Sequence, residues 1–207
     1  MMGFFDSLFG GKKRTNVEVV PDLIWMTTDA KFDGLATEVE VRSRSETVAI
    51  LLVAHFPDVL ARLNELSGHQ ASDVPIEAVL AGKLNTDLAA SLNLDESATI
   101  DIIVGERHPL PSVDDRLEEF AGELPCHCRL SHHVSLEDPI MKVLAGEWTR
   151  NVLSKLGATE DEAFGSEMLS RRIRQAQRKI EGRSCGNFDA PSAGQWLKKN
   201  CPELANK

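Results

Sequence analysis

The pattern of apolar and polar positions predicts an α/β domain in the first two thirds of the chain. Residues 47–54, TVAILLVA, form an unbroken apolar run, which is typical of a central parallel strand covered on both faces. Residues 74–80 and 98–104 are predicted to be further strands, and helices are predicted at 57–66 and 84–92. Alternating strands and helices of this kind are typical of a parallel sheet with helices on its faces.

A further strand and helix are predicted before this region. An extended run begins at Val19, and residues 27–29 form a turn. The helix that follows directs four apolar side chains inward: Phe32, Leu35, Ala36 and Val39. We therefore expect a parallel sheet of about four or five strands over residues 20–136.

Residues 135–183 are predicted to form two helices around a short acidic turn. Asp138 and Pro139 have the character of an N-cap and a first-turn proline, and Gly157 ends the first helix. Ser166 is placed to cap the second helix, whose apolar stripe is narrow: Met168, Leu169, Ile173, Ala176 and Ile180. The rest of that helix is rich in cations: Arg171, Arg172, Arg174, Arg178, Lys179 and Arg183. Such a helix either packs along one edge with its cations in solvent or offers a binding face.

Three segments of this region carry a family resemblance. They read SLEDPIM, GEWTRNVLSKLG and SEMLSRRIRQAQRKIEGR, and they begin at Ser135, Gly146 and Ser166. Together they resemble the bacterial preprotein-translocation ATPase SecA, where its second motor domain passes into a long scaffold helix. Residues 21–32 also resemble the entry to that motor domain, whereas Ser184 and Cys185 interrupt the last run. The resemblance, in degenerate and truncated form, implies a RecA-like fold of the P-loop NTPase type followed by a two-helix C-terminal extension.

This resemblance and the local patterns predict four segments along the chain. They are a flexible or amphipathic N-terminal tail at 1–16, a degenerate RecA-like motor-type domain at 17–136, a helical scaffold-like segment at 137–183, and a C-terminal tail at 184–207. The tail contains a short predicted helix near 195–200, which Trp196 and Leu197 can dock on the body of the protein.

Residues that hydrolyse ATP in such motors are missing or altered. The sequence contains no Gly-x-x-x-x-Gly-Lys-Ser/Thr phosphate loop. Residues 105–108, GERH, resemble the family's Gly-Thr-Glu-Arg-His, but the positions of three family arginines hold Glu118, Phe120 and Glu123. Losing such cations lowers phosphoryl-transfer rates by roughly 10³ to 10⁵. We therefore predict no catalytic residue and no cofactor, although the family uses ATP. We also predict no ATP hydrolysis by this chain alone.

Residues 126–133, CHCRLSHH, gather thiols and imidazoles that could bind zinc. Zinc takes four such ligands in a tetrahedron, and the segment offers four: Cys126, Cys128, His132 and His133. However, a Cys-x-Cys pair and adjacent histidines alternate across a strand. The spacing predicts instead a strand with both thiols and Leu130 on one face, and we predict no metal site.

Composition and charge narrow the class of partner. The net charge of −9 argues against nucleic-acid binding by the whole surface. No apolar run is long enough to cross a membrane, and the N-terminus lacks the features of a secretory signal. Four cysteines without an export signal read as reduced thiols, so we expect a cytoplasmic protein. The aromatic and basic residues of 4–14 could also contact the inner face of an anionic membrane, or they form a flexible tail or a latch on the protein itself.

Two functions from different classes follow. The first is a SecA-like binding or regulatory module for protein translocation that lacks ATPase activity, with SecA, the translocation channel or a preprotein as partner. Its predicted binding residues are Arg171, Arg174, Arg178 and Lys179. The second is one half of a split SecA-type ATPase that completes a nucleotide site in trans with a phosphate-loop subunit. Reuse of the fold outside secretion is a third possibility, because fold does not fix function.

Overall fold

A seven-stranded sheet forms the centre of the molecule in the computed structural model, which describes residues 16–69, 72–85, 94–144 and 162–205. Its strands are β1 Val17–Val19, β2 Leu23–Trp25, β3 Thr47–Ala54, β4 Ile76–Leu80, β5 Thr99–Val104, β6 His127–Ser135 and β7 Phe164–Gly165. The order is β4-β3-β5-β6-β2-β7, and β1 also pairs with β6. Every pair except β2–β7 is parallel. The predicted α/β, RecA-like class is confirmed.

The edge beside β6 differs from the single strand that the sequence predicts. Two short strands, β1 and β2, pair with β6 in succession, at Val17 opposite Cys128 and at Leu23 opposite His133. Pro21 lies between them and has no N–H to donate to a neighbouring strand. The antiparallel strand β7 pairs with the other edge of β2. Residues from the scaffold-like region therefore complete the sheet, which the apolar pattern did not indicate.

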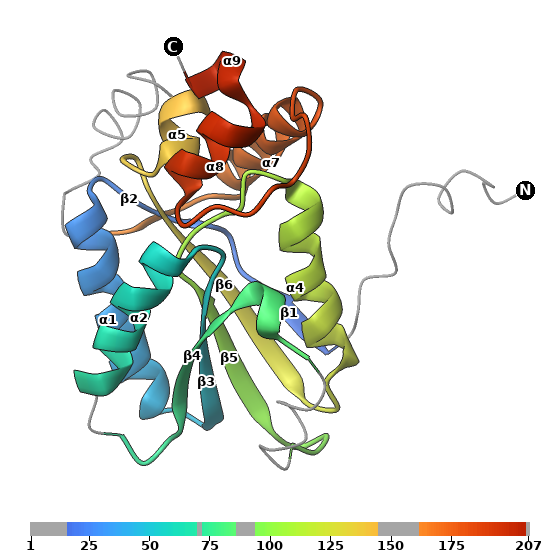
Figure 1. Cartoon of the computed structure of the whole chain (residues 1–207). Coiled ribbons are helices and arrows are strands. Elements are labelled where there is room, and N and C mark those ends of the chain that lie inside the picture. The colour runs from blue at the N-terminus through green and yellow to red at the C-terminus, as the bar shows by residue number, and fades with distance from the viewer. Residues whose placement is uncertain (1–15, 70–71, 86–93, 145–161, 206–207) are drawn as a thin grey trace, which may run out of the picture.

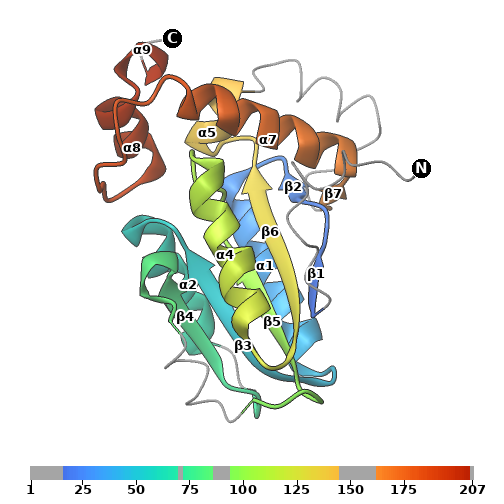
Figure 2. The same ribbon diagram turned by 90° about the vertical axis from the view of Figure 1, so that its right-hand side faces the viewer.

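Three helices cover the two faces of this sheet. Helices α1 (Thr28–Ser43) and α2 (Pro57–His69) pack against the face that carries Ile50, Leu52 and Ile103. Helix α4 (Pro111–Glu123) packs on the opposite face. Figure 2 shows α4 in front of β5 and β6, with α1 behind them. The unbroken apolar run of β3 is explained, because both faces of that strand are buried.

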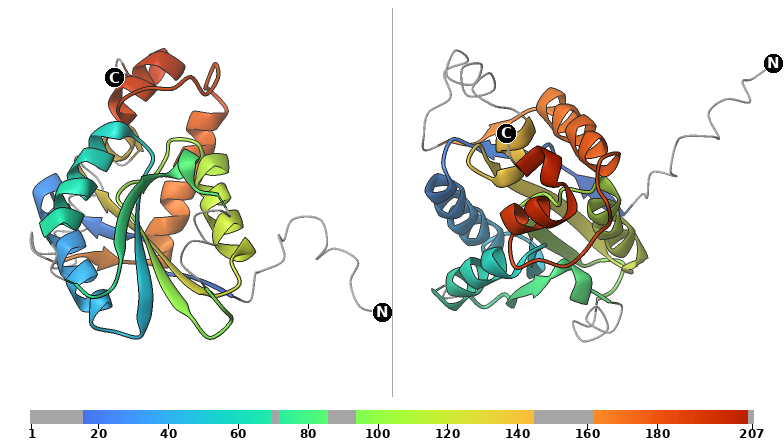
Figure 3. Two further views of the ribbon diagram at one scale, coloured as in Figure 1. Left: turned by 60° about the horizontal axis from the view of Figure 1, so that its bottom comes forward. Right: turned by 45° about the horizontal axis from the view of Figure 1, so that its top comes forward.

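Four helices gather where the parallel strands end. They are α5 Pro139–Leu144, α7 Glu167–Glu181, α8 Ala193–Asn200 and α9 Pro202–Ala205. Figure 1 shows them above the arrowheads of the strands, and the right-hand panel of Figure 3 shows α5, α7 and α8 lying over those ends. A third apolar cluster joins them to the sheet and includes the fully buried Trp196, so the predicted docking of the C-terminal helix is confirmed.

Several predicted elements extend beyond the described residues. The first helix of the scaffold-like region is described only to Leu144, and its predicted remainder to Gly157 lies outside. Most of the helix predicted at 84–92 and the whole of segment 4–14 also lie outside. After β4, the structure has a short 3-10 helix at Ala81–Lys83.

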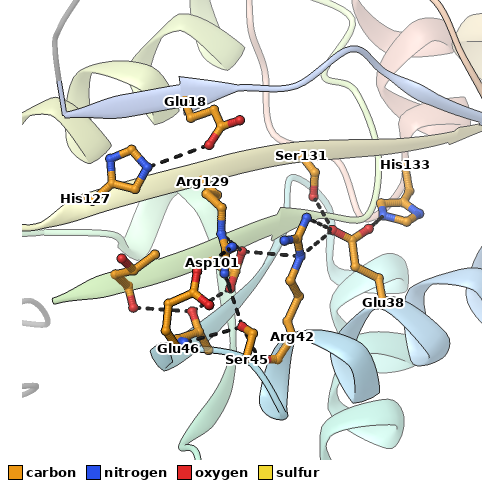
Figure 4. Close-up of polar contacts among 12 residues, drawn as sticks. Glu18, Glu38, Arg42, Ser45, Glu46, Asp101, His127, Arg129, Ser131 and His133 are labelled. Carbon is orange, nitrogen blue, oxygen red and sulfur yellow. Dashed lines mark hydrogen bonds and ion pairs between the residues drawn. The ribbon is translucent and has the colours of Figure 1, made fainter.

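An ion pair joins strands β5 and β6 on the face of the sheet that α1 covers. Asp101 of β5 lies directly opposite Arg129 of β6, and two guanidinium nitrogens of Arg129 donate to its carboxylate at 2.9 and 2.8 Å. Arg42 of α1 approaches the same carboxylate to 3.6 Å. Figure 4 shows both arginines reaching Asp101 from these two elements. Because a shift of one residue would separate the pair, it favours this register of β5 and β6.

We expect Gly34→Ala to destabilise the protein, because a Cβ at this position of α1 would lie 2.0 Å from the Trp25 ring. Overpacking of this kind costs about 1–3 kcal/mol of unfolding free energy. Gly68→Ala is the matched control, since a Cβ there meets nothing within 4 Å. In a helix that change is neutral or stabilises by up to about 1 kcal/mol. Urea unfolding measures both, and equal stability of the two variants would contradict the packing described here.

Candidate functional site

The best-defined polar cluster in the described residues surrounds Arg107, just beyond the carboxyl end of β5. Its Nε donates to Asp22 Oδ1 at 2.7 Å, and its Nη1 donates to Asp114 Oδ2 at 3.1 Å. Asp22 precedes β2 and Asp114 lies in α4, so the guanidinium joins segments far apart in the sequence. Burial alone would lower the pKa of Arg107, but the two carboxylates outweigh it and raise the pKa. Arg107 therefore stays charged and is held on both sides.

Asp114 is the hub of this cluster. Its oxygens accept from the backbone N–H of His108 at 3.1 Å and from Nε2 of Gln177 at 2.6 Å. His55 Nε2 also lies 2.9 Å away, at ion-pair distance but without hydrogen-bond geometry. Burial would raise the pKa of Asp114, yet Arg107 and His55 lower it well below its usual range. Through Gln177, this carboxylate connects helix α7 to the end of the sheet.

Buried imidazoles complete the cluster. Burial lowers the pKa of His108 to about 3, helped by His55, and it lowers the pKa of His132 to about 3, helped by Arg107. Both rings are therefore neutral at physiological pH. In the part of the chain that the structure describes, the buried side-chain atoms without a hydrogen-bond partner all belong to this cluster: Asp22 Oδ2, His55 Nε2, both ring nitrogens of His132, and Gln177 Oε1.

Glu106 forms a second buried group beside this cluster. Its Oε1 accepts from the backbone N–H groups of His55 and Phe56 at 3.1 and 3.0 Å, where the chain leaves β3. Burial raises the pKa of Glu106 to about 8, although Lys31 opposes the shift. The residue therefore titrates close to neutral pH and supports the turn between β3 and α2.

The Ser-Leu-Glu-Asp segment, residues 135–138 at the end of β6, contacts the start of α1. Lys31 Nζ, almost fully buried, donates to both oxygens of Asp138 at 2.8 and 3.1 Å. Ser135 donates to the same carboxylate through its N–H and its hydroxyl. Glu137 accepts from the backbone N–H of Thr28 at 2.8 Å, in the first turn of α1. These polar residues therefore join helices α1 and α5 at the end of the sheet.

The side chains of the histidine- and cysteine-rich segment 126–133 lie in different surroundings. Cys126, Cys128 and Leu130 lie in the apolar cluster beneath α4, as the alternation predicts. His132 joins the Arg107 cluster, whereas His133 accepts from Trp25 Nε1 at 3.1 Å and lies 2.7 Å from Glu38. Among the described residues, no three such side chains are grouped so that they could hold a metal ion.

Comparison with known proteins identifies the relatives of this chain. No protein-family model matches it. SecA of Clostridium novyi (strain NT) is 29% identical over 194 residues, which cover 82% of this chain and 22% of that protein. SecA of Clostridium beijerinckii is 30% identical over 193 residues, with the same coverage. SecA 1 of Alkaliphilus metalliredigens is 32% identical over 132 residues, or 59% of this chain and 15% of that protein.

The chain is homologous to a segment of SecA. The resemblance to SecA recognised from the three C-terminal motifs is therefore confirmed. The chain spans about a fifth of the length of the first two of these relatives, 22% in each. The described residues contain no helix that is both long and apolar enough to span a membrane.

The positions of the three SecA arginines all lie on α4. Phe120 is buried in the apolar cluster against the sheet. Glu118 is half-buried, and burial raises its pKa even though Arg107 opposes the shift. Glu123 is exposed at the end of the helix. The three positions therefore hold one apolar side chain and two acids, and Arg107 of the GERH segment is enclosed by Asp22 and Asp114.

The predicted binding residues fall into two groups on α7. Arg174 contacts the Asp115 carboxylate and donates to Pro111 O at 3.2 Å, so it holds α7 against α4. Arg171 is exposed and donates to Glu167 at 3.0 Å, one turn away in the same helix. Arg178 and Lys179 are exposed near the end of the helix. The predicted set is therefore divided between an internal contact and an outer face.

Sequence reasoning missed the buried polar side of α7. Gln177 is fully buried and donates to Asp114 and to the backbone oxygen of His108. Ser170 accepts from the backbone N–H of Asp22 at 2.8 Å. Gln177 lies between Ile173 and Ile180 on the apolar stripe. A polar residue within that stripe was the signal in the sequence that could have indicated a buried polar contact of α7. Its partners, by contrast, lie too far away in the sequence to be inferred.

The raised pKa of Glu106 predicts a pH-dependent stability. Between the unfolded pKa near 4.5 and the folded pKa of about 8, the folded state keeps a proton that the unfolded state has lost. Stability contributed by this proton is complete below the unfolded pKa and is lost as the pH rises toward 8. Glu106→Gln keeps the acceptor oxygen but cannot ionise, so the variant should gain stability relative to wild type as the pH rises. Thermal unfolding across this range measures the difference, and a constant difference would rule out this titration.

Proposed function

We propose that the chain is a SecA-like binding or regulatory module for protein translocation that does not hydrolyse ATP. The proposal takes residues 17–136 as the motor-type domain and residues 137–183 as the scaffold-like segment. Its partner is SecA, the translocation channel or a preprotein, and it works in the cytoplasm, where residues 4–14 can add a peripheral contact to the membrane. Homology to SecA supports the role in translocation.

The proposal that the chain does not hydrolyse ATP rests on Arg107 and on the residues that occupy the three SecA arginine positions. A phosphoryl-transfer site needs cations that can reach the transferring group. In this chain Arg107 is bound by Asp22 and Asp114, and the three SecA arginine positions on α4 hold Glu118, Phe120 and Glu123. The described chain therefore supports a structural use of the motif better than a catalytic one.

The covering of the strand ends supports the same conclusion. Ligands of open parallel sheets bind beyond the carboxyl ends of the strands. Here Trp196 of α8 packs edge-on against His108 with ring centroids 5.3 Å apart, and His108 stacks on Phe56 at the same distance. Pro191 O also accepts from Asp58 N at 3.2 Å, at the start of α2. A nucleotide shared with a second subunit would have to displace α8, which argues against the split-ATPase alternative.

An ATPase assay tests the absence of catalysis. We expect the purified chain to show no turnover above background, and we expect its addition to purified SecA to leave the rate per SecA unchanged or lower. Phe120→Arg, which reintroduces a cation but also opens the core, is not expected to create turnover. Hydrolysis that follows the purified chain through purification would contradict the proposal. Turnover that appears only when a phosphate-loop subunit is added would support the split-ATPase alternative instead.

Charge reversal on α7 tests the binding face. We expect Arg178→Glu with Lys179→Glu to lower the affinity for immobilised SecA by about tenfold or more, with an unchanged melting temperature, because both residues are exposed. Arg44→Glu with Lys83→Glu makes the same charge change on other exposed positions and should leave binding intact. Arg174→Glu, by contrast, should lower the melting temperature through its contacts with α4.

Two results would contradict this assignment. If SecA binds the reversed variant as well as it binds wild type, the outer face of α7 is not the contact. If the control pair weakens binding equally, the effect reflects net charge, and no particular surface is identified by it. Binding should also weaken with added salt, since exposed charges are screened over a Debye length of about 8 Å at physiological ionic strength.

A further inference from the structure

An exposed phenylalanine stands on a firmly held loop between α7 and α8. Phe188 is 54% exposed, although its backbone is fixed on both sides by the buried Asn200. The Phe188 N–H donates to Asn200 Oδ1 at 2.7 Å, and Asn200 Nδ2 donates back to Phe188 O at 3.0 Å. Next to it, Trp196 Nε1 donates to Asn187 Oδ1 at 2.7 Å. The ring is therefore presented to solvent by a supported backbone.

The turn before this phenylalanine requires glycine. Gly186 has φ 159°, in the region that favours glycine, and a Cβ there would approach the Phe188 ring to 2.9 Å. The SecA-like Asn-Phe-Asp run, residues 187–189, thus lies outside helix α7 and exposes the Phe188 side chain, which we call the knob. Knobs of one rigid aromatic side chain are typical anchors of protein interfaces.

Lys199 lies against the exposed face of Phe188. Lys199 Nζ lies 5.7 Å from the centroid of the Phe188 ring and donates to Asp189 O at 3.1 Å. Lys198 and Arg183 are also exposed close to the loop in sequence or on α8. A surface that receives Phe188 should therefore be apolar at its base and acidic at its rim.

Such a surface exists on the same molecule, between α1 and β2. A cavity of about 530 Å³ is lined by Leu23, Trp25, Gly34 and Val41, among others. Val41, on its rim, is 61% exposed. The cavity is large enough for an aromatic side chain and its neighbouring backbone.

The polar groups at the base of this cavity are already paired. Trp25 Nε1 can only donate, so the Nδ1 of His133 that accepts from it must carry a lone pair. The other ring nitrogen of His133 therefore carries the hydrogen and donates to Glu38, 2.7 Å away. Figure 4 shows this pair side by side. A side chain that enters the cavity would therefore make apolar contacts there, because the His133 and Glu38 side chains already pair with each other.

Acidic residues mark the outer side of the cavity. Asp33 lines it, and Asp29 and Glu40 are exposed along the same helix α1. The Glu40 carboxylate has Arg44 as a partner, and Asp29 lies 3.9 Å from Arg62. No ion pair of Asp33 is present among the described residues. Asp33 is therefore the acidic group of the rim that can face the lysines near Phe188, since Arg42, which also lines the cavity, is paired with Glu38 and Asp101.

We propose that Phe188 of one copy of this chain seats in the α1–β2 cavity of a second copy, with Lys198 facing Asp33. Each chain carries both the knob and the cavity, so two copies form either two reciprocal contacts or a head-to-tail series. This self-association goes beyond the proposed translocation function and does not rest on it.

Analytical ultracentrifugation of the full chain tests the contact. We expect the weight-average mass of wild type to rise above the monomer value between micromolar and millimolar concentration. Phe188→Ser should weaken the association by about tenfold or more, because it removes the anchor. Met168→Ser is the control, since Met168 is another exposed apolar side chain, 53% exposed on α7, and is not among the residues that line the cavity. Phe188 supports no described core, so both variants should fold as wild type does.

A charge exchange tests the orientation of the contact. Asp33→Lys and Lys198→Glu should each weaken association, and the chain carrying both changes should recover it. A wild-type mass that stays monomeric throughout would overturn the proposal. Association that survives Phe188→Ser, or that the double exchange fails to restore, would also overturn it and would assign the interface elsewhere.

Discussion

The ion pairs of Arg107 are the constraint on which the end of the sheet depends. A guanidinium buried this deeply is tolerated only when carboxylates and hydrogen bonds replace water. Asp22 and Asp114 meet this need, and they come from the start of β2 and from α4. Removing either partner would leave a buried charge uncompensated, a change that typically costs about 3–5 kcal/mol. The strand ends and α4 are therefore held in one arrangement.

The same cluster carries the attachment of α7 to the sheet. Leu169, Ile173 and Ile180 pack this helix into the apolar cluster, but apolar contacts are not directional. Gln177 adds direction, because its amide must reach Asp114 and the His108 backbone oxygen at once. Arg174 repeats the arrangement at the surface of α4. Residues of the SecA-like segment 166–183 thus serve the packing of helices against strand ends in this chain.

Parts of the fold could be read directly from the chain because they follow from local periodicity. The apolar run of 47–54 became the central strand β3, and the alternation of Cys126, Cys128 and Leu130 predicted that they share one face of a strand, which the structure packs under α4. The break of the edge into β1 and β2, and the pairing of β7 with β2, could not be read. Short strands of two or three residues carry almost no periodic signal, and their pairing depends on a partner distant in sequence.

The sequence by itself determined the class of fold, the resemblance to a segment of SecA and the absence of a phosphate loop, because each follows from contiguous residues. Only the tertiary structure decided what the charged and polar residues do. Arg107, Lys31 and Gln177 would each be expected at the surface from their polarity, yet all three are buried. Burial becomes favourable only once Asp22, Asp114 and Asp138 are brought within hydrogen-bond distance, and folding alone creates that proximity.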